Sequence, residues 1–431
     1  MKKYFLFILL ASYTLFAEQW PLERCIEHAL KHNKTIRLHT ENITSDSAKV
    51  IQAKSVFYPD LSANANTSVS GAPFAQPSVD PSGNVSLGLS SRVTLFDAKK
   101  SAKRLSIAQK TLEQDKSILK SEIRDMISLV ARSYISVLYA AEALKNADEA
   151  VSLSQKQFEY QQALKEAGMT TSLALSKSNA QLSKNKYSQT SAQNAFDFAV
   201  LQIKQLLELD SNVDFEVTDT LLWERQNENS NGIANLSADS VFEIYGNNFV
   251  SELYSGQLSV EIAQMSLDIA KAGKMPTLSA NGSLSTSINS RSENSATEQL
   301  RNQISPSMGL NLSVPIVDNR SAKSSKIIAE SNLNKAKISL EATRQNIRSQ
   351  IEQLVADIKS AAARFVSARE QFLAETENMR IIEEMYGMGN LTVIDYASQE
   401  NNFLSAQSEF TQAKYSLMLS KKLLEIYLSY N

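Results

Sequence analysis

Several residue types are scarce in this 431-residue chain, and each scarcity excludes a class of protein. A single cysteine, Cys25, rules out an intrachain disulfide. With 44 Lys and Arg against 46 Asp and Glu, the chain lacks the basic field that nucleic acid binding requires. Aromatic residues make up only 7% of the chain, and apolar residues 43%. This composition suits long helices with polar faces better than a compact enzyme core.

The first residues have the pattern of a secretory signal. Lys2 and Lys3 precede an apolar run from Tyr4 to Leu15, and Ala17 is a suitable cleavage residue. The run is shorter than the ~20 residues of a membrane-spanning helix, which favours a cleaved signal over 1–17 rather than an uncleaved anchor. No later stretch reads as a membrane-spanning helix. The sequence therefore predicts an exported protein.

The chain contains the same arrangement twice. Tyr58-Pro59-Asp60-Leu61-Ser62-Ala63-Asn64 is matched half a chain later by Met275-Pro276-Thr277-Leu278-Ser279-Ala280-Asn281. Each copy leads into alternating polar and apolar segments, then a long heptad pattern that breaks at a glycine, then a shorter helical stretch. The sequence predicts a first repeat over 18–208, a second over 237–431, and a small lobe over 209–236 between them.

Alternation of apolar and polar residues predicts two strands in each repeat, at about 61–70 and 84–95 and at about 277–288 and 303–316. Each is roughly ten residues long, which suits a tilted strand in a membrane barrel. A half-buried strand in a soluble sheet alternates in the same way. The small polar residues of the second face favour a wet lumen. Because four strands cannot close a membrane barrel, such a barrel requires several chains in cyclic symmetry.

Heptads predict two long helices, over 97–164 and 318–386, each returning through a shorter helix, over 170–208 and 391–428. Apolar residues recur seven apart, as at Ile123, Val130 and Val137, which implies a left-handed coiled coil, and the returning helices make it antiparallel. At 1.5 Å per residue each long helix would reach about 100 Å. The fold class is mainly α with a membrane β part and an internal duplication.

The chain resembles the outer-membrane factor family, the TolC-like outer membrane efflux proteins. The resemblance covers essentially all of the mature chain and rests on the order of loose motifs. These are Leu22 with Ala29-Leu30-Lys31-His32-Asn33, Tyr58-Pro59-Asp60-Leu61, Val93-Thr94-Leu95-Phe96-Asp97, Leu312-Ser313-Val314-Pro315-Ile316-Val317-Asp318, and Tyr386-Gly387-Met388-Gly389-Asn390-Leu391-Thr392-Val393-Ile394-Asp395.

The resemblance implies a homotrimer whose twelve-stranded barrel lies in the outer membrane and whose helical tunnel lies in the periplasm. It implies an exit duct of tripartite efflux or type I secretion, fed by a periplasmic adaptor and an inner-membrane transporter. A coiled-coil tethering protein without a pore would use the same heptads and is the alternative. Drug efflux and protein secretion remain equally compatible with the sequence.

The resemblance also assigns residues to the periplasmic end of the tunnel. The helix tips, expected to dock the adaptor, are Ala167, Gly168, Met169, Thr170, Met388, Gly389 and Asn390. The constriction is expected at Asp395, Ser398, Leu391 and Tyr386. Asp395 occupies the place of an inward-facing acidic ring, or else complements the dipole of its helix. Ser398 stands where the family has a second Asp. Leu391 stands where the family has an arginine that locks the closed mouth.

No enzyme, cofactor or metal site is expected. Cys25, His28 and His32 share one helical face at i, i+3 and i+7, but zinc would need a fourth ligand that the neighbouring sequence does not offer. A packing or surface role is favoured. No nucleophile, base and orienting residue form a recognisable catalytic set.

Overall fold

The computed structural model describes residues 19–72, 79–210, 212–217 and 250–429. The predicted signal and most of the predicted lobe between the repeats lie outside these residues. The chain divides into two compact units, each built from both repeats. The tip unit is drawn from Met1–Leu38, Lys120–Val250 and Asn346–Asn431, and the sheet unit from His39–Leu119 and Ser251–Gln345.

The described residues are mainly helical, with one four-stranded sheet, which confirms the fold class. The helices are α1 (Leu22–His32), α2 (Lys34–Ser55), α3 (Lys100–Glu166), α4 (Ser172–Leu206), α7 (Val250–Lys271), η2 (Ala272–Lys274), α8 (Ala296–Asn302), α9 (Ser321–Gly387) and α10 (Val393–Ser429). The strands are β1 (Gln19–Trp20), β2 (Ser62–Ala72), β3 (Val79–Phe96), β4 (Glu216–Val217), β5 (Thr277–Asn289) and β6 (Ser305–Ser313).

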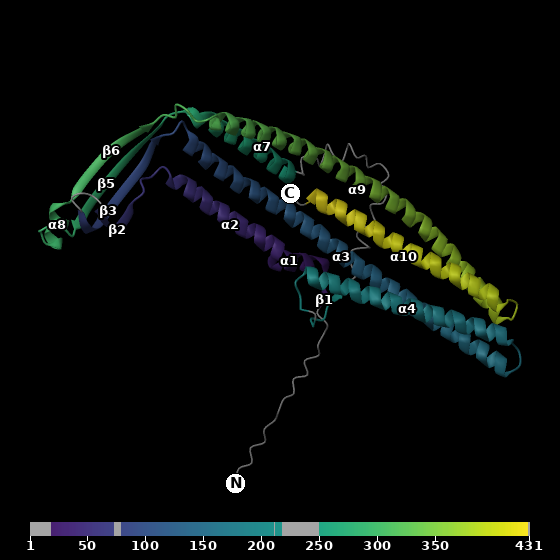
Figure 1. Cartoon of the computed structure of the whole chain (residues 1–431). Helices are drawn as coiled ribbons and strands as arrows, with labels where there is room; N and C mark the ends of the chain where they lie inside the picture. The colour runs from purple at the N-terminus through teal and green to yellow at the C-terminus, as the bar shows by residue number, and fades with distance from the viewer. Residues whose placement is uncertain (1–18, 73–78, 211, 218–249, 430–431) are drawn as a thin grey trace, which may run out of the picture. The chain divides into compact units, whose positions relative to one another are not determined.

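The strands of the two repeats form one antiparallel sheet in the order β2-β3-β5-β6 (Figure 1). The register places apolar residues together on one face: Leu89 pairs with Ala63 on one side and with Leu284 on the other. Leu310 and Leu312 on β6 belong to the same face and are exposed. A single chain therefore presents an uncovered apolar sheet face.

The opposite face of the sheet is polar and almost uncharged. Ser62 and Ser90 hydroxyls lie 2.8 Å apart, and the row continues through Ser283 and Ser307, whose hydroxyls lie 2.7 Å apart. Apart from Arg92, the described residues of this face are Ser, Asn, Thr and Gly. Such a face suits contact with water rather than with a packed core.

Three features of the strand region differ from the sequence prediction. β3 begins at Val79 rather than near 84. β6 ends at Ser313 instead of reaching 316, since Pro315 has no N–H to continue a ladder. The stretch between the two predicted strands of the second repeat contains the short helix α8, which begins at a capping box made by Ser295 and Glu298. The strand bounds were predicted from the alternation of apolar and polar residues, and that alternation does not mark these features.

Both strand-to-helix junctions have the same unusual backbone. Ala98 and Lys99 have φ of 55° and 64°, and the equivalent Asn319 and Arg320 have 49° and 67°. Left-handed backbone costs roughly 1–2 kcal/mol per residue other than glycine. The Asp before each pair caps the helix that follows: the Asp97 carboxylate accepts from the backbone N–H of Ser101 at 2.6 Å, and Asp318 does so from Ala322 at 2.9 Å. The duplication thus extends to backbone detail.

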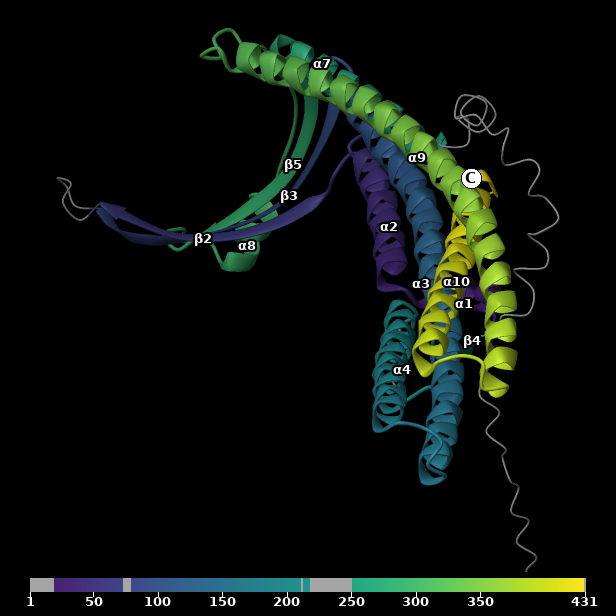
Figure 2. The same cartoon turned by 90° about the vertical axis from the view of Figure 1, so that its right-hand side faces the viewer.

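The long helices α3 and α9 each contain 67 residues and return through α4 and α10. Figure 2 shows each long helix with its shorter partner. The heptad residues pack between them: Phe365 and Phe372 of α9 flank Phe410 of α10, with ring centroids 5.7 and 5.2 Å away. In α3, Val130 and Val137 are fully buried. The heptads therefore mark real seams in the tip unit.

Within the described residues, α3 also contains an 18-residue window that is long and apolar enough to cross a membrane by length and composition. The expectation that no later stretch would have this character was therefore too strict. Half of the window is buried, and α3 contributes Val130, Tyr134 and Val137 to the protein interior. A core helix has the same composition as a spanning one, which explains the coincidence.

We predict that Val137→Asp destabilises the protein by roughly 3–5 kcal/mol, because a carboxylate at this fully buried site would have no partner. Thermal unfolding and the yield of assembled protein measure the effect. Ser136→Asp is the matched control, since Ser136 is exposed in the single chain. If both variants were equally stable, the seam would not be buried in the assembled protein.

Candidate functional site

Each long helix ends in the same glycine turn. The N–H of Gly168 donates to the carbonyl of Lys165 at 3.0 Å, and the N–H of Met169 donates to that of Leu164 at 2.8 Å. In the second repeat, the N–H of Gly389 donates to the carbonyl of Tyr386 at 2.9 Å, and the N–H of Asn390 donates to that of Met385 at 3.0 Å. The two glycines have φ of 74° and 76°, a region that favours glycine. This bond pair is the Schellman motif, which satisfies carbonyls that a helix end would leave free.

A threonine then begins each returning helix. Thr171 Oγ1 accepts from the backbone N–H of Ala174 at 3.2 Å, and Thr392 Oγ1 accepts from that of Asp395 at 3.2 Å. Thr392 also donates to Asp395 Oδ2 at 2.6 Å. In the single chain, the Asp395 carboxylate is therefore part of the helix cap. It remains exposed.

The predicted docking residues are almost all on the surface of the two tips. Ala167, Gly168 and Asn390 are exposed, and Thr170 is half-buried. Met169 and Met388 are 75% and 69% exposed, which is unusual for such apolar side chains. A hollow of about 350 Å³ lies between the tips and is lined by residues of both repeats, including Met169, Thr170, Gly389 and Leu391. The two tips thus form one surface.

The four residues predicted at the constriction have different surroundings. Asp395 and Ser398 are exposed, while Leu391 is half-buried against the cluster of Met379, Tyr386 and Tyr396. Tyr386 is only 8% exposed. In the single chain it is the centre of an interior contact rather than a surface residue.

The hydroxyl of Tyr386 joins the two tips through glutamines. Gln157 Nε2 donates to it at 2.5 Å, and Gln161 Nε2 donates to it as well. Gln161 Oε1 in turn accepts from Thr170 Oγ1 at 3.0 Å. The second-repeat tip is thereby hydrogen-bonded to α3 and to the turn after it. Sequence reasoning missed both glutamines, although their i, i+4 spacing beside the heptad seam is a usable signal.

A second polar contact lies inside the tip unit. Asn185 Nδ2 donates to Glu400 Oε1 at 3.1 Å and to the carbonyl of Ala150 at 3.2 Å, which links α4, α10 and α3. Glu400 is 1% exposed, and burial raises the pKa of its carboxyl above the ordinary value. Nothing in the sequence distinguishes Glu400 from the other helical glutamates, so this pair was not predicted.

The cysteine and histidines of α1 form a packing cluster. Cys25 is fully buried, and burial raises the pKa of its thiol to about 12, which disfavours the thiolate that a metal would bind. His28 and His32 stack at 4.4 Å, and His28 packs edge-on against Trp20 at 5.4 Å. The described residues contain no group of three or more metal-ligating side chains.

Comparison with known proteins gives a consistent picture. A family model described as outer membrane efflux protein matches residues 25–208 and 251–426. Outer membrane protein TolC of Salmonella enteritidis is 20% identical over 427 residues, which cover 96% of this chain and 82% of that protein.

Solved structures share the fold at low identity. CusC, described as forming a transmembrane channel, aligns with a TM-score of 0.80 at 15% identity, over 95% of this chain and 92% of its own. The Campylobacter jejuni outer membrane channel CmeC aligns with a TM-score of 0.80 at 17% identity, over 94% and 85%.

The surroundings of Glu400 give a pH prediction. Because its carboxyl has a raised pKa in the folded protein, folding binds a proton there, so stability is greatest below the unfolded pKa and falls as pH rises through the folded pKa. Glu400→Gln keeps an acceptor for Asn185 and removes the titration. We expect the variant to melt higher than the parent at pH 8, and the difference to shrink towards pH 4.

Differential scanning calorimetry from pH 4 to 8 measures this effect. Glu409→Gln, at an exposed position of the same helix, is the control and should follow the parent. A Glu400→Gln variant that melted with the parent's pH dependence would show that this carboxyl is not desolvated in the assembled protein.

Proposed function

This chain belongs to the outer membrane efflux protein family, and we propose that it is the exit duct of a tripartite efflux or type I secretion system. Membership places it in the outer membrane, with its helical tunnel in the periplasm. In the proposed assembly, three copies join with a periplasmic adaptor and an inner-membrane transporter. Cargo would pass from the transporter through this duct to the cell exterior, and the transporter would supply the energy.

The observation that carries the proposal is the open four-stranded sheet. Within the described residues, β2 and β6 each pair on one side only, so each has a row of free backbone N–H and C=O groups. Unpaired backbone groups in lipid are very costly, which means that β6 of one copy must pair with β2 of the next. Three copies would make twelve strands with the serine-rich face inward and the leucine face towards lipid.

The tip surface supports docking of an adaptor. Exposed Met169 and Met388, with the adjacent hollow, form a mixed apolar and polar patch shared by both repeats. Methionine side chains adapt to partner surfaces because they are unbranched and polarizable. The docking surface we propose consists of Ala167, Gly168, Met169, Thr170, Met388, Gly389 and Asn390.

We further propose that the tips form the closed mouth of the duct. Three copies of Asp395, exposed at the start of α10, would give one acidic tier, with Ser398 one turn further along. Leu391 replaces a charged lock by apolar packing against the Tyr386 cluster. Tyr386 would act from within the wall, by holding the second-repeat tip against Gln157 and Gln161.

Purification and planar-bilayer recording test the proposed function together. The detergent-extracted protein should elute as a trimer and insert as a channel of low open probability. A monomer, or a trimer that gave no conductance even in the mouth variants below, would favour the alternative of a tethering coiled-coil protein without a pore.

We predict that Tyr386→Phe raises the open probability by about tenfold or more. The substitution leaves two glutamine amides of the closed tip without their acceptor, at a cost of roughly 1–3 kcal/mol to that state. Tyr160→Phe is the matched control, because the Tyr160 ring packs against Tyr386 at 5.9 Å without sharing the hydroxyl network. Equal open probability in both variants would remove Tyr386 from the latch.

We predict that Asp395→Asn lowers cation selectivity and weakens block by multivalent cations. A carboxylate ring in a narrow pore concentrates cations, whereas an exposed helix-start Asp contributes at most about 1 kcal/mol to stability. Reversal potential in a salt gradient measures the first effect and thermal unfolding the second. Asp357→Asn, exposed on α9, is the control. An unchanged reversal potential would leave Asp395 with its capping role alone.

A further inference from the structure

Positive charge gathers where the helices of the sheet unit meet the strands. Three short segments, 97–104, 268–274 and 318–326, contain nine Lys and Arg against three Asp, although the whole chain has a net charge of −2. We call these nine residues the junction belt: Lys99, Lys100, Lys103, Arg104, Lys271, Lys274, Arg320, Lys323 and Lys326.

The acids of these segments are already engaged. Asp97 and Asp318 cap α3 and α9, and their carboxylates accept backbone N–H groups of those helices. Asp268 forms an ion pair with Lys103. The helix N-termini are therefore occupied by the protein's own carboxylates, and the excess charge of the belt lies on side chains.

Most of the belt is available to an external anion. Lys326 pairs with Glu330 at 3.4 Å, and Lys103 with Asp268. Six belt cations are exposed and form no ion pair with any described residue: Lys99, Arg104, Lys271, Lys274, Arg320 and Lys323.

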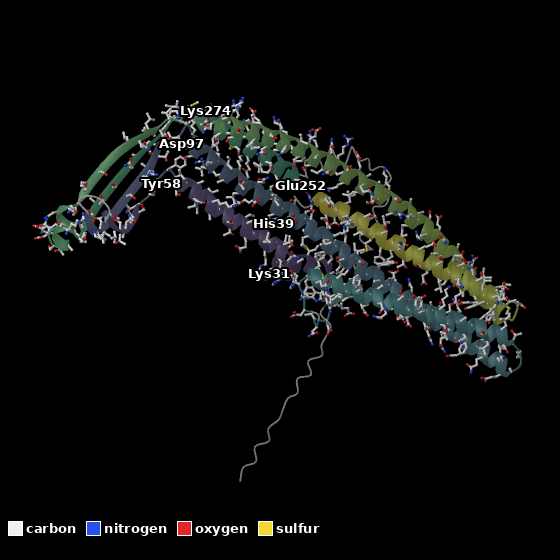
Figure 3. The ribbon with its side chains drawn as sticks, viewed as in Figure 1. Lys31, His39, Tyr58, Asp97, Glu252 and Lys274 are labelled. Carbon is white, nitrogen blue, oxygen red and sulfur yellow. The ribbon has the colours of Figure 1, made fainter. Side chains whose placement is uncertain are left out.

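The belt is one surface, not three. The Lys103–Asp268 ion pair joins α3 to α7. Gly273 of η2 lies against Ala322 of α9, where an added Cβ would be 3.7 Å from the alanine Cβ. Figure 3 shows Asp97, Lys274 and Tyr58 at the border between strands and helices. The ends of α3, α7 and α9 in this unit are thus adjacent.

Each strand of the four-stranded sheet has the same order of residue types at its helix end. An exposed apolar or aromatic side chain is followed, on the helix side, by an exposed cation. The four pairs are Tyr58 with Lys54, Phe96 with Lys99, Met275 with Lys274, and Val317 with Arg320. At the other end of the sheet, the segment 290–302 between β5 and β6 has two Arg and two Glu. The excess of cations is therefore confined to one edge of the apolar band.

From this arrangement we infer that the junction belt binds the headgroups of anionic phospholipids in the leaflet that faces the helices. The inference rests on the outer-membrane position of the strands. Apolar side chains at the strand ends would contact the acyl chains, and the ammonium and guanidinium groups beyond them would lie at the depth of the phosphates. The lipid would fix the depth of the barrel in the membrane.

A neighbouring copy of the chain is the competing occupant, and the topology argues against it. Lys99 follows β3 and Lys274 precedes β5, the two inner strands of the sheet, so both lie away from the edge strands that would pair between copies. A neighbour that joins at β2 and β6 would not cover the inner junctions. Lipids around the barrel would reach the helix junctions of all four strands.

Native mass spectrometry of the full-length detergent-extracted protein tests the inference, with an equimolar mixture of phosphatidylglycerol and phosphatidylethanolamine as the probe. The parent should retain phosphatidylglycerol preferentially. The variant Lys99→Gln, Lys274→Gln and Arg320→Gln should lower the ratio of the two bound lipids by at least fivefold. The control variant Lys156→Gln, Lys186→Gln and Lys359→Gln loses the same charge at exposed sites of the tip unit and should keep the parental ratio.

Size-exclusion chromatography of each variant separates this inference from the proposed assembly. If the belt variant no longer assembles, the parent itself is decisive: its preference should fall between 50 and 500 mM NaCl, since salt screens exposed charges. No preference in the parent, a preference that salt leaves unchanged, or equal ratios in the belt and control variants would each overturn the inference.

Discussion

The backbone groups at the two open edges of the sheet are the constraint on which the rest of this protein depends. A soluble sheet can leave its edges to water, but a sheet in hydrocarbon cannot. β2 and β6, both at these edges, come from different repeats, so the proposed ring would join the first repeat of one copy to the second repeat of the next. The long helices continue from the strands at the same junctions, so in the proposed assembly they would share the symmetry of the barrel.

Duplication gives this architecture two kinds of contact at the helix tips. The glycine turns and threonine caps are the same in both repeats, and they set the shape of each hairpin independently of its partner. The contacts between hairpins are different in kind, because they are unsymmetrical: a tyrosine of the second repeat meets glutamines of the first. The two repeats thus have the same turn at the tip of each helical hairpin, whereas the hydrogen bonds between the two hairpins use different residues on each side. The proposed duct, which would have to hold closed and also open, would need bonds of modest strength at that connection, and neutral hydrogen bonds are of that order.

The sequence predicts the parts of this fold that depend on local periodicity. Heptads locate α3 and α9, alternation locates the strands, and proline and glycine locate their ends to within a few residues, apart from β3, which begins at Val79 rather than near 84, and β6. The site is less accessible. Gln157 and Tyr386 are 229 positions apart, as are many pairs that never touch, and only packing brings them together. Glu400 looks like any helical glutamate until its burial is known. The sequence allows Asp395 two roles, at an acidic ring or at the start of its helix. Its hydrogen bond from Thr392 is compatible with the second role, and both stay predictions.

The equal length of α3 and α9 has a consequence for how such a chain can change. Both helices have 67 residues, and the capping Asp and the tip glycine are 71 positions apart in each repeat, from Asp97 to Gly168 and from Asp318 to Gly389. Pro59 and Asp97 are 38 positions apart in the first repeat, whereas the equivalent Pro276 and Asp318 are 42 apart in the second. The four extra residues lie in the strand region with its loop. One residue added to a long helix would advance its tip by 1.5 Å and turn it by about 100°. A change in the length of one long helix alone would therefore shift its tip relative to the other tip, whereas the four extra residues of the second repeat leave both helix lengths equal.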